Sequence, residues 1–186
     1  NWDLINKTNW NMAENLQPFS FNFERNELAF YFPTSWKMFK DSNHDNSSVK
    51  PLRFVLKHED KEKNIGVINI YLYSRTSKEN FESIASNIET RFKSISGLEC
   101  EIQKKVTDNI LNPKLEKVWY IQGDLEYPKK QFRAVLMSYL IQGNSGICYI
   151  ESIGPRPCFK NYYWEASKRC IELIVESFDN MDFSKE

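Results

Sequence analysis

The sequence is poor in the features that mark several classes of protein. Its 186 residues include 25 basic and 25 acidic side chains, for a formal net charge of +0. The chain therefore lacks the broad positive field of a general nucleic-acid-binding protein. Its apolar runs, such as 147–150, are far shorter than the roughly 20 residues of a membrane-spanning helix. We expect no nucleic-acid partner and no membrane span, with peripheral membrane association arising only through a partner.

The residues that usually carry catalysis are also scarce. The chain has six glycines and two histidines, His44 and His58. It contains no Gly-x-Gly-x-x-Gly, Walker, Gly-x-Ser-x-Gly or His-Glu-x-x-His motif. Its cysteines show neither a Cys-x-x-Cys pair nor the spacing of a zinc site, so we expect them to be small apolar side chains buried in the core. They are Cys100, Cys148, Cys158 and Cys170. We therefore predict a protein that is not an enzyme, with no catalytic residue, no metal and no cofactor.

Two short segments resemble metal sites only in part. Residues 41–45 place oxygen ligands at positions 1, 3 and 5 of a calcium loop, but Asn46 replaces the glycine at position 6 and Leu52 replaces the bidentate glutamate at position 12. A mobile surface loop is the favoured interpretation, with weak calcium binding as the alternative. His58, Glu59 and Asp60 are adjacent in a charged turn, where side chains usually diverge rather than converge on a metal.

The two ends of the chain differ in character from its middle. Residues 1–17 show no sustained hydrophobic period, which predicts an extended N-terminal arm. Trp2 and Trp10 have no role in a solvated arm, so we expect them to dock on a partner or on the domain itself. Residues 18–180 are predicted to form a single domain and residues 181–186 a short tail. The chain begins at Asn1 rather than Met, which leaves removal of a targeting segment open.

Alternating apolar and polar residues predict strands on both sides of one helical segment. Before the helix they predict short strands at 19–23, 28–32, 52–56 and 65–73, arranged as an antiparallel meander. After it, strands are expected at 98–106, 117–125, 131–142 and 147–153. The strand at 131–142 has apolar side chains on both faces, so we expect both faces of its sheet to be covered.

Two helices are predicted to provide this cover. Thr76 and Glu79 have the spacing of a capping box, and apolar residues then recur at helical spacing until Gly97. A second amphipathic helix is expected at 163–178. Strands and helices in this order predict an α/β fold, a three-layer α/β/α sandwich whose central, mainly antiparallel sheet is flanked by helices.

The loop before the second helix is the strongest candidate for a partner-binding surface. It is rich in arginine and aromatic residues, which dominate binding energy at protein interfaces. The alternative is that Phe159 and Tyr163 close the end of the sandwich. With the two tryptophans of the arm, the candidate partner-binding residues are Trp2, Trp10, Arg156, Phe159, Tyr162 and Tyr163.

Several segments resemble, in the same order, those of PsbP-type domains, the extrinsic proteins of photosystem II. They are Phe-Tyr-Phe-Pro-Thr-Ser-Trp-Lys at 30–37, Ile-Asn-Ile-Tyr at 68–71, Val-Trp-Tyr at 118–120, Ile-Cys-Tyr-Ile at 147–150, and the stretch from Trp164 to Phe178. The resemblance covers about residues 19–178. It implies a non-catalytic accessory or assembly subunit that docks on a larger complex, a photosystem in the thylakoid lumen.

The same fold is shared by other functional classes, which remain as alternatives. One is a bacterial cell-envelope lipoprotein or secretion chaperone, which would place the protein in the periplasm, the envelope or the cytosol. Another is a Mog-type Ran-binding factor.

Overall fold

The computed structural model describes residues 15–23, 26–41, 51–60, 63–74, 78–106, 112–155 and 162–179. Within these ranges, the elements before the first described helix are β1 (Leu16–Phe23), β2 (Asn26–Pro33), β3 (Trp36–Lys40), β4 (Leu52–Asp60) and β5 (Lys63–Tyr73). The elements that follow are α2 (Phe81–Lys93), β6 (Glu99–Val106), β7 (Lys117–Tyr127), the short 3-10 helix η1 (Pro128–Lys130), β8 (Phe132–Gly143), β9 (Gly146–Pro155) and α3 (Tyr162–Ser177).

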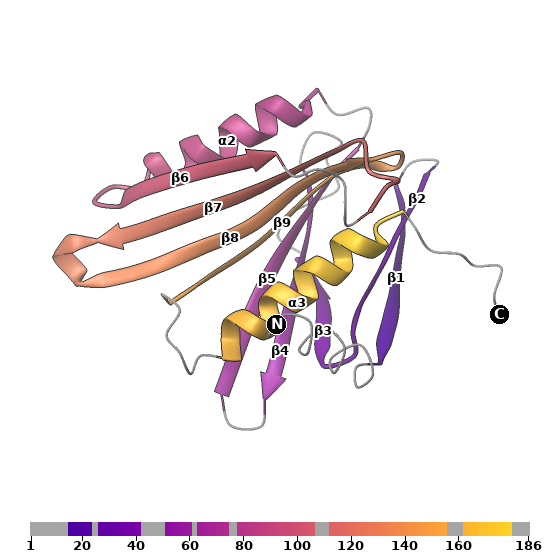
Figure 1. Ribbon diagram of the computed structural model, residues 1–186, viewed down its shortest axis with the longest axis horizontal. Coiled ribbons are helices and arrows are strands. Elements are labelled where there is room, and N and C mark those ends of the chain that lie inside the picture. Colours follow the sequence, from indigo (N-terminus) through magenta and orange to yellow (C-terminus); the bar gives the residue numbers. More distant parts are fainter. Residues whose placement is uncertain are drawn as a thin grey trace, which may run out of the picture.

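Seven of the strands form one sheet, in the order β3-β4-β5-β9-β8-β7-β6, and each neighbouring pair is antiparallel. β1 and β2 form a separate two-stranded antiparallel ribbon. Figure 1 shows the long β7–β8 hairpin extending away from the rest of the molecule, with α2 along β6 and α3 beside β5.

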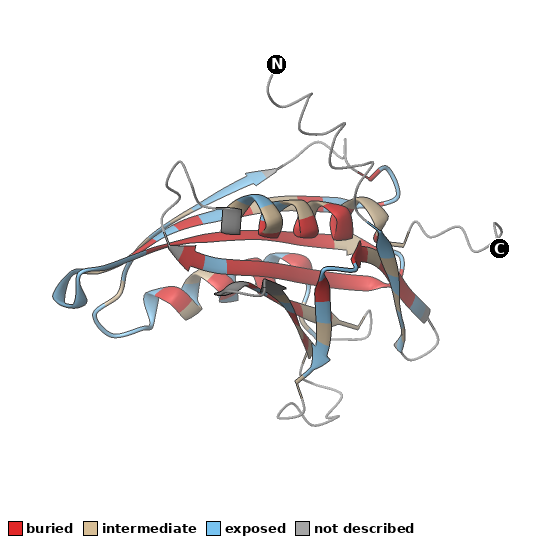
Figure 2. Ribbon diagram, turned by 90° about the horizontal axis from the view of Figure 1, so that it is seen from below, coloured by how far each residue is buried: buried red, intermediate tan, exposed pale blue. Residues whose placement is uncertain are grey.

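α2 and α3 lie on opposite sides of the sheet, as Figure 2 shows. Alternate residues of β8 explain this arrangement, because successive side chains of a strand point to opposite faces. Leu136 and Leu140 pack in the hydrophobic cluster of α2, whereas Tyr139 and Ile141 pack in the cluster of α3. The expected two-sided burial of this strand is confirmed.

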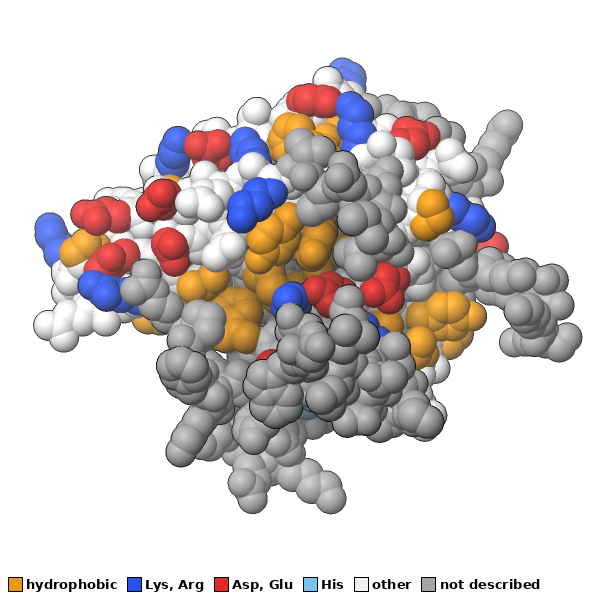
Figure 3. Space-filling model, viewed as in Figure 1, with side chains coloured by type: hydrophobic (Ala, Val, Ile, Leu, Met, Phe, Trp, Pro, Cys, Tyr) orange, Lys and Arg blue, Asp and Glu red, His pale blue; other side chains and the backbone are white. Residues whose placement is uncertain are grey.

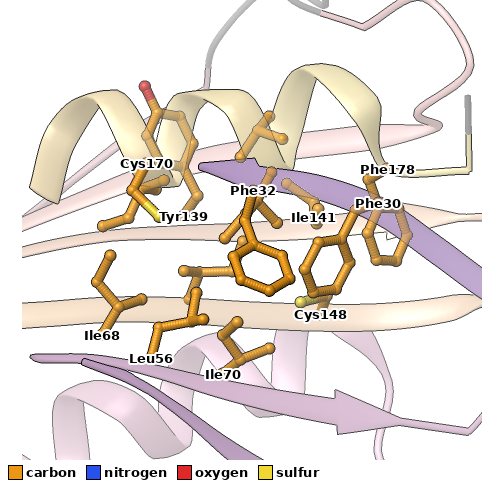
Figure 4. Close-up of a cluster of buried hydrophobic side chains, with 14 of the residues drawn as sticks. Phe30, Phe32, Leu56, Ile68, Ile70, Tyr139, Ile141, Cys148, Cys170 and Phe178 are labelled. Carbon is orange, nitrogen blue, oxygen red and sulfur yellow. The ribbon is translucent and has the colours of Figure 1, made fainter. Parts of the chain in front are cut away.

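The β1–β2 ribbon shares the α3 side of the sheet. Phe30 and Phe32 of β2 lie in one buried cluster with Leu56 of β4, Ile70 of β5 and Phe178 just after α3 (Figure 4). The ring of Phe19 in β1 stacks on that of Phe30, with 4.8 Å between the ring centroids. A β-ribbon and a helix therefore cover this face together.

The expected three-layer α/β/α sandwich is wrong. The described residues contain nine strands and only two α-helices, and one face is covered partly by β1 and β2 rather than by helices. The β1–β2 ribbon buries apolar side chains against the same face as α3, so apolar residues on both faces of the sheet did not imply that helices alone form the outer layers. The fold is mostly β, built around a seven-stranded antiparallel sheet.

The first described helix begins later than its sequence predicted. Its N-cap is Asn80, whose Oδ1 accepts a hydrogen bond of 2.8 Å from the Ser83 backbone N–H. Ser83 Oγ accepts one of 3.0 Å from the Asn80 N–H in return. This reciprocal pair replaces the box expected at Thr76 and Glu79. The predicted burial of Phe81, Ile84, Ala85, Ile88 and Phe92 is confirmed. The same spacing also placed Ile95 on this face, but Ile95 lies beyond the end of α2 and is 38% exposed.

Candidate functional site

The sheet face on the α2 side is covered by α2 over one half, and no described helix or strand covers the other half. Phe39 of β3 lies opposite Val55 of β4, and Val55 lies opposite Asn69 of β5. Asn69 in turn lies opposite Glu151 of β9. Directly opposed residues share a face, so a single row of side chains runs from the β3 edge of the sheet toward α2.

Exposed hydrophobic side chains gather on this half. Val67 and Ile153 lie two residues from Asn69 and Glu151 on their strands, so their side chains point to the same face. Phe39 is 44% exposed, Val67 41% and Ile153 38%. They are three of the six exposed large hydrophobic residues in the described chain. We call the surface formed by Phe39, Val55, Val67, Asn69 and Ile153 the open sheet face.

Basic side chains surround the open sheet face. Lys57 lies opposite Lys37, and its ammonium is 5.5 Å from the centroid of the Phe39 ring. Arg53 pairs with Asp41 at 3.0 Å and donates a hydrogen bond of 3.0 Å to Asn69 Oδ1. With Arg91 and Glu151, described below, the described side chains on or beside this half of the sheet are four basic and two acidic.

A buried carboxylate lies where the open sheet face meets α2. Glu151 is 3% exposed, and its Oε2 accepts hydrogen bonds from the Arg91 guanidinium of α2 and, at 2.8 Å, from the Tyr149 hydroxyl. Arg91 is 40% exposed. The ion pair therefore joins the helix to the sheet, with its acid inside and its base partly in solvent.

The tyrosines around this ion pair are shifted toward their neutral forms. Burial raises the pKa of Tyr71, Tyr73 and Tyr149 above the usual value, and for Tyr71 and Tyr149 the nearby Glu151 carboxylate adds to the rise. Arg91 opposes the rise in Tyr71 without cancelling it. These hydroxyls consequently act as neutral hydrogen-bonding groups rather than as bases near neutral pH.

A pocket of about 100 Å³ lies between α2 and the sheet, beside the ion pair. Tyr71, Tyr73 and Tyr149 line it from the strands. The α2 side contributes Ile84, Asn87, Ile88 and Arg91. We call this the pocket under α2. Its walls combine aromatic rings and aliphatic groups with a cation at the mouth, which suits a ligand that is apolar at one end and anionic at the other.

A second surface lies at the far end of the β6–β7–β8 sheet, where Figure 3 shows acidic side chains gathered. Glu99 lies opposite Glu126, and Glu101 lies opposite Asp124. Arg133 Nε contacts Glu126 at 2.9 Å. No group of three or more His, Cys, Asp or Glu side chains in the described part of the chain is arranged to hold a metal ion. These carboxylates form a charged surface and no metal centre.

The partner-binding residues predicted from the sequence cannot be compared with this geometry. Trp2, Trp10, Arg156 and Phe159 lie outside the described residues. Tyr162 and Tyr163 begin the backbone of α3, but their side chains also lie outside the described set. Their role in partner binding stays a prediction, as does the extended character of the arm.

The candidate metal segments give a similar result. His44 and almost all of the calcium-like loop lie outside the described residues, as do the side chains of Glu59 and Asp60. His58 is described, and its ring packs edge-on against Trp36 with 5.1 Å between centroids. Cys148 and Cys170 are buried, as their sequence predicted, and Cys100 is partly buried. In the described part of the chain, no helix is both long and apolar enough to cross a membrane.

Arg91 and Glu151, which are 60 residues apart, are not among the site residues predicted from the sequence. One signal was present: Glu151 interrupts the apolar run 147–153, and a buried charge in a strand needs a partner. Nothing local identifies that partner, because Arg91 meets Glu151 only when α2 packs on β9. The open sheet face was not predicted either, because β3, which forms its edge, was not predicted as a strand.

Comparison with known proteins adds little to this geometry. No protein-family model matches the chain, and no curated protein matches it by sequence. Among solved structures, a crystal structure of a Pseudomonas aeruginosa protein of unknown function is similar with a TM-score of 0.42 and 10% identity. The match covers 84% of this chain and 94% of that one. The comparisons therefore do not support the resemblance to PsbP-type proteins.

Proposed function

We propose that this chain is a non-catalytic interaction module that docks on a larger protein assembly, and that its open sheet face binds a helical segment of the partner. The observation that carries the proposal is the gathering of Phe39, Val67 and Ile153 on one half-face that no described element covers. Exposed apolar patches of this kind mark interaction sites, because a soluble protein otherwise leaves few of them in water.

A helix suits the open sheet face better than an extended segment does. The backbone groups of β4 and β5 are already paired with neighbouring strands. A segment that lies across the face must therefore satisfy its own backbone hydrogen bonds, as a helix does. α2 covers the other half of the same face in this way. A partner helix would complete the layer beside it.

The charge around the open sheet face indicates the chemistry of the partner. Among the described side chains of this region, Arg53, Lys57 and Arg91 outnumber Asp41 and Glu151. Complementary charge steers association and excludes partners of the wrong sign. We therefore expect an amphipathic helix with an aliphatic stripe and acidic flanks. The resemblance to PsbP-type proteins predicts a photosystem as the assembly, and this part of the proposal rests on the resemblance alone.

Two synthetic helical peptides test the proposal. They share one leucine stripe, but one has glutamate and the other lysine at its polar positions. Fluorescence anisotropy with the intact protein should show the acidic peptide binding at least tenfold more tightly, which corresponds to about 1.4 kcal/mol. This assay measures binding of the helix itself, so it does not require the identity of the larger assembly.

A matched pair of variants locates the binding surface. Val67→Glu places an acid at the centre of the open sheet face and should weaken acidic-peptide binding at least tenfold. Phe132→Glu changes a side chain that is 50% exposed on the β8 end of the hairpin and should bind normally. Failure of the acidic peptide to bind, or an equal loss in both variants, would contradict the proposal.

A further inference from the structure

We propose that the pocket under α2 is an anchor site for one branched aliphatic side chain of the partner, whose neighbouring carboxylate is bound by Arg91. This inference rests on the proposed function and adds the specificity of that site. Interfaces concentrate their binding energy in a few side chains that fill fully desolvated pockets. The pocket under α2 is a concave feature beside the open sheet face, and a side chain that fills it would be desolvated by its walls.

Its volume sets the size of the side chain. An apolar cavity of about 150 Å³ in another protein is large enough to bind benzene. At about 100 Å³, the pocket under α2 has about two thirds of that volume, so a four-carbon leucine or isoleucine side chain should fill it better than a six-carbon phenyl ring. Tyr71 and Tyr73 form one wall and Ile84 and Ile88 of α2 the other. Both walls offer apolar surface to an aliphatic group.

Arg91 supplies the charge at the mouth. One of its terminal nitrogens donates to Glu151, and a guanidinium carries five N–H donors in all. The side chain is 40% exposed, so donors remain within reach of a ligand. Because the Glu151 carboxylate fixes the guanidinium against the sheet, less entropy is lost when a second carboxylate binds.

Tyr71 connects the pocket to the open sheet face. Its ring lines the pocket, and the Arg53 guanidinium carbon lies 5.7 Å from its centroid. Arg53 also bonds Asn69 of the open sheet face. A helix that crosses that face beside α2 would therefore reach the pocket with a side chain from its edge.

Methyl-labelled protein and three small probes test the anchor site by NMR. N-acetyl-leucine at millimolar concentration should shift the δ1 methyl signals of Ile84 and Ile88. N-acetyl-leucine amide lacks the carboxylate and should bind at least tenfold more weakly, about 1.4 kcal/mol. N-acetyl-phenylalanine should bind at least tenfold more weakly than N-acetyl-leucine because its ring is larger than an isobutyl group. Equal binding of the leucine and phenylalanine probes, or no shift with any probe, would overturn the inference.

Two exposed positions on α2 provide a matched pair of variants. Asn87 lines the pocket and Ser86 does not, and both are exposed. Asn87→Trp should block the mouth and abolish the N-acetyl-leucine shifts, whereas Ser86→Trp should retain them. Full binding in Asn87→Trp would place the probe elsewhere and overturn the inference. The effect of Val67→Glu on acidic-peptide binding is measured separately. The proposed role of the open sheet face is therefore kept if the anchor site alone is disproved.

Discussion

The Arg91–Glu151 pair makes an asymmetric prediction about stability. Breaking a buried ion pair by removing one partner costs about 3–5 kcal/mol when the charge left behind stays buried. Glu151 is 3% exposed, whereas Arg91 is 40% exposed. Arg91→Met strands the carboxylate in the interior and should cost about 3–5 kcal/mol. Glu151→Gln leaves an unpaired Arg91 guanidinium that can rotate into solvent. Because water then screens its charge, this variant should cost about 1–2 kcal/mol.

The double variant sharpens this test. Arg91→Met combined with Glu151→Gln leaves no buried charge, so it should be more stable than Arg91→Met alone. Urea unfolding followed by tryptophan fluorescence gives the three free energies. Arg133→Met is the control, because it breaks an exposed pair with Glu126 in which the side chains are 60% and 42% exposed. It should change stability by less than about 1 kcal/mol. A smaller loss in Arg91→Met than in Glu151→Gln would refute the reasoning.

Two further predictions concern groups away from the open sheet face. Asn112 is fully buried, and its amide nitrogen donates to the carbonyls of Val175 and Phe178 at the end of α3. Asn112→Ala should therefore cost about 1–3 kcal/mol in urea unfolding. Asn112→Asp should cost more, because it replaces the buried donor with an acid, and the reverse order would contradict this. Burial, with a smaller contribution from Glu172, raises the pKa of Tyr139 to about 12. The folded state favours the neutral phenol, so the free energy of unfolding should fall as the pH rises from about 10 to about 12. Tyr139→Phe should lose less stability over that range, and an equal or larger loss would contradict this direction.

Short-range pattern explains which local predictions were right. The five buried residues of α2 recur at helical spacing, and the alternation in β8 fixes which side chains face each helix. The helix start was wrong because two capping pairs compete within eight residues, Thr76 with Glu79 and Asn80 with Ser83. Side-chain oxygens in both can accept backbone hydrogen bonds. The structure uses the later pair, in which Asn80 is the N-cap.

β3 was missed because its local signal is weak. Its five residues have lysine at two positions and a phenylalanine on the face that is left open. Only Trp36 is fully buried. Its pairing with β4 stabilises it as a strand, and such pairing depends on a segment more than ten residues away. Without β3, no pattern in the sequence predicted a wide sheet with an uncovered half.

The sequence by itself determined the antiparallel strands on both sides of α2, the helical pattern of α2 and α3 and the two-sided burial of β8, because these follow from side-chain period along one segment. Only the tertiary structure decided the balance of strand over helix in the layers, the meeting of Arg91 with Glu151, and the open sheet face. Each depends on where an element crosses the sheet. The register between strands and the position of a helix above them are set by packing between distant segments, which no local period records.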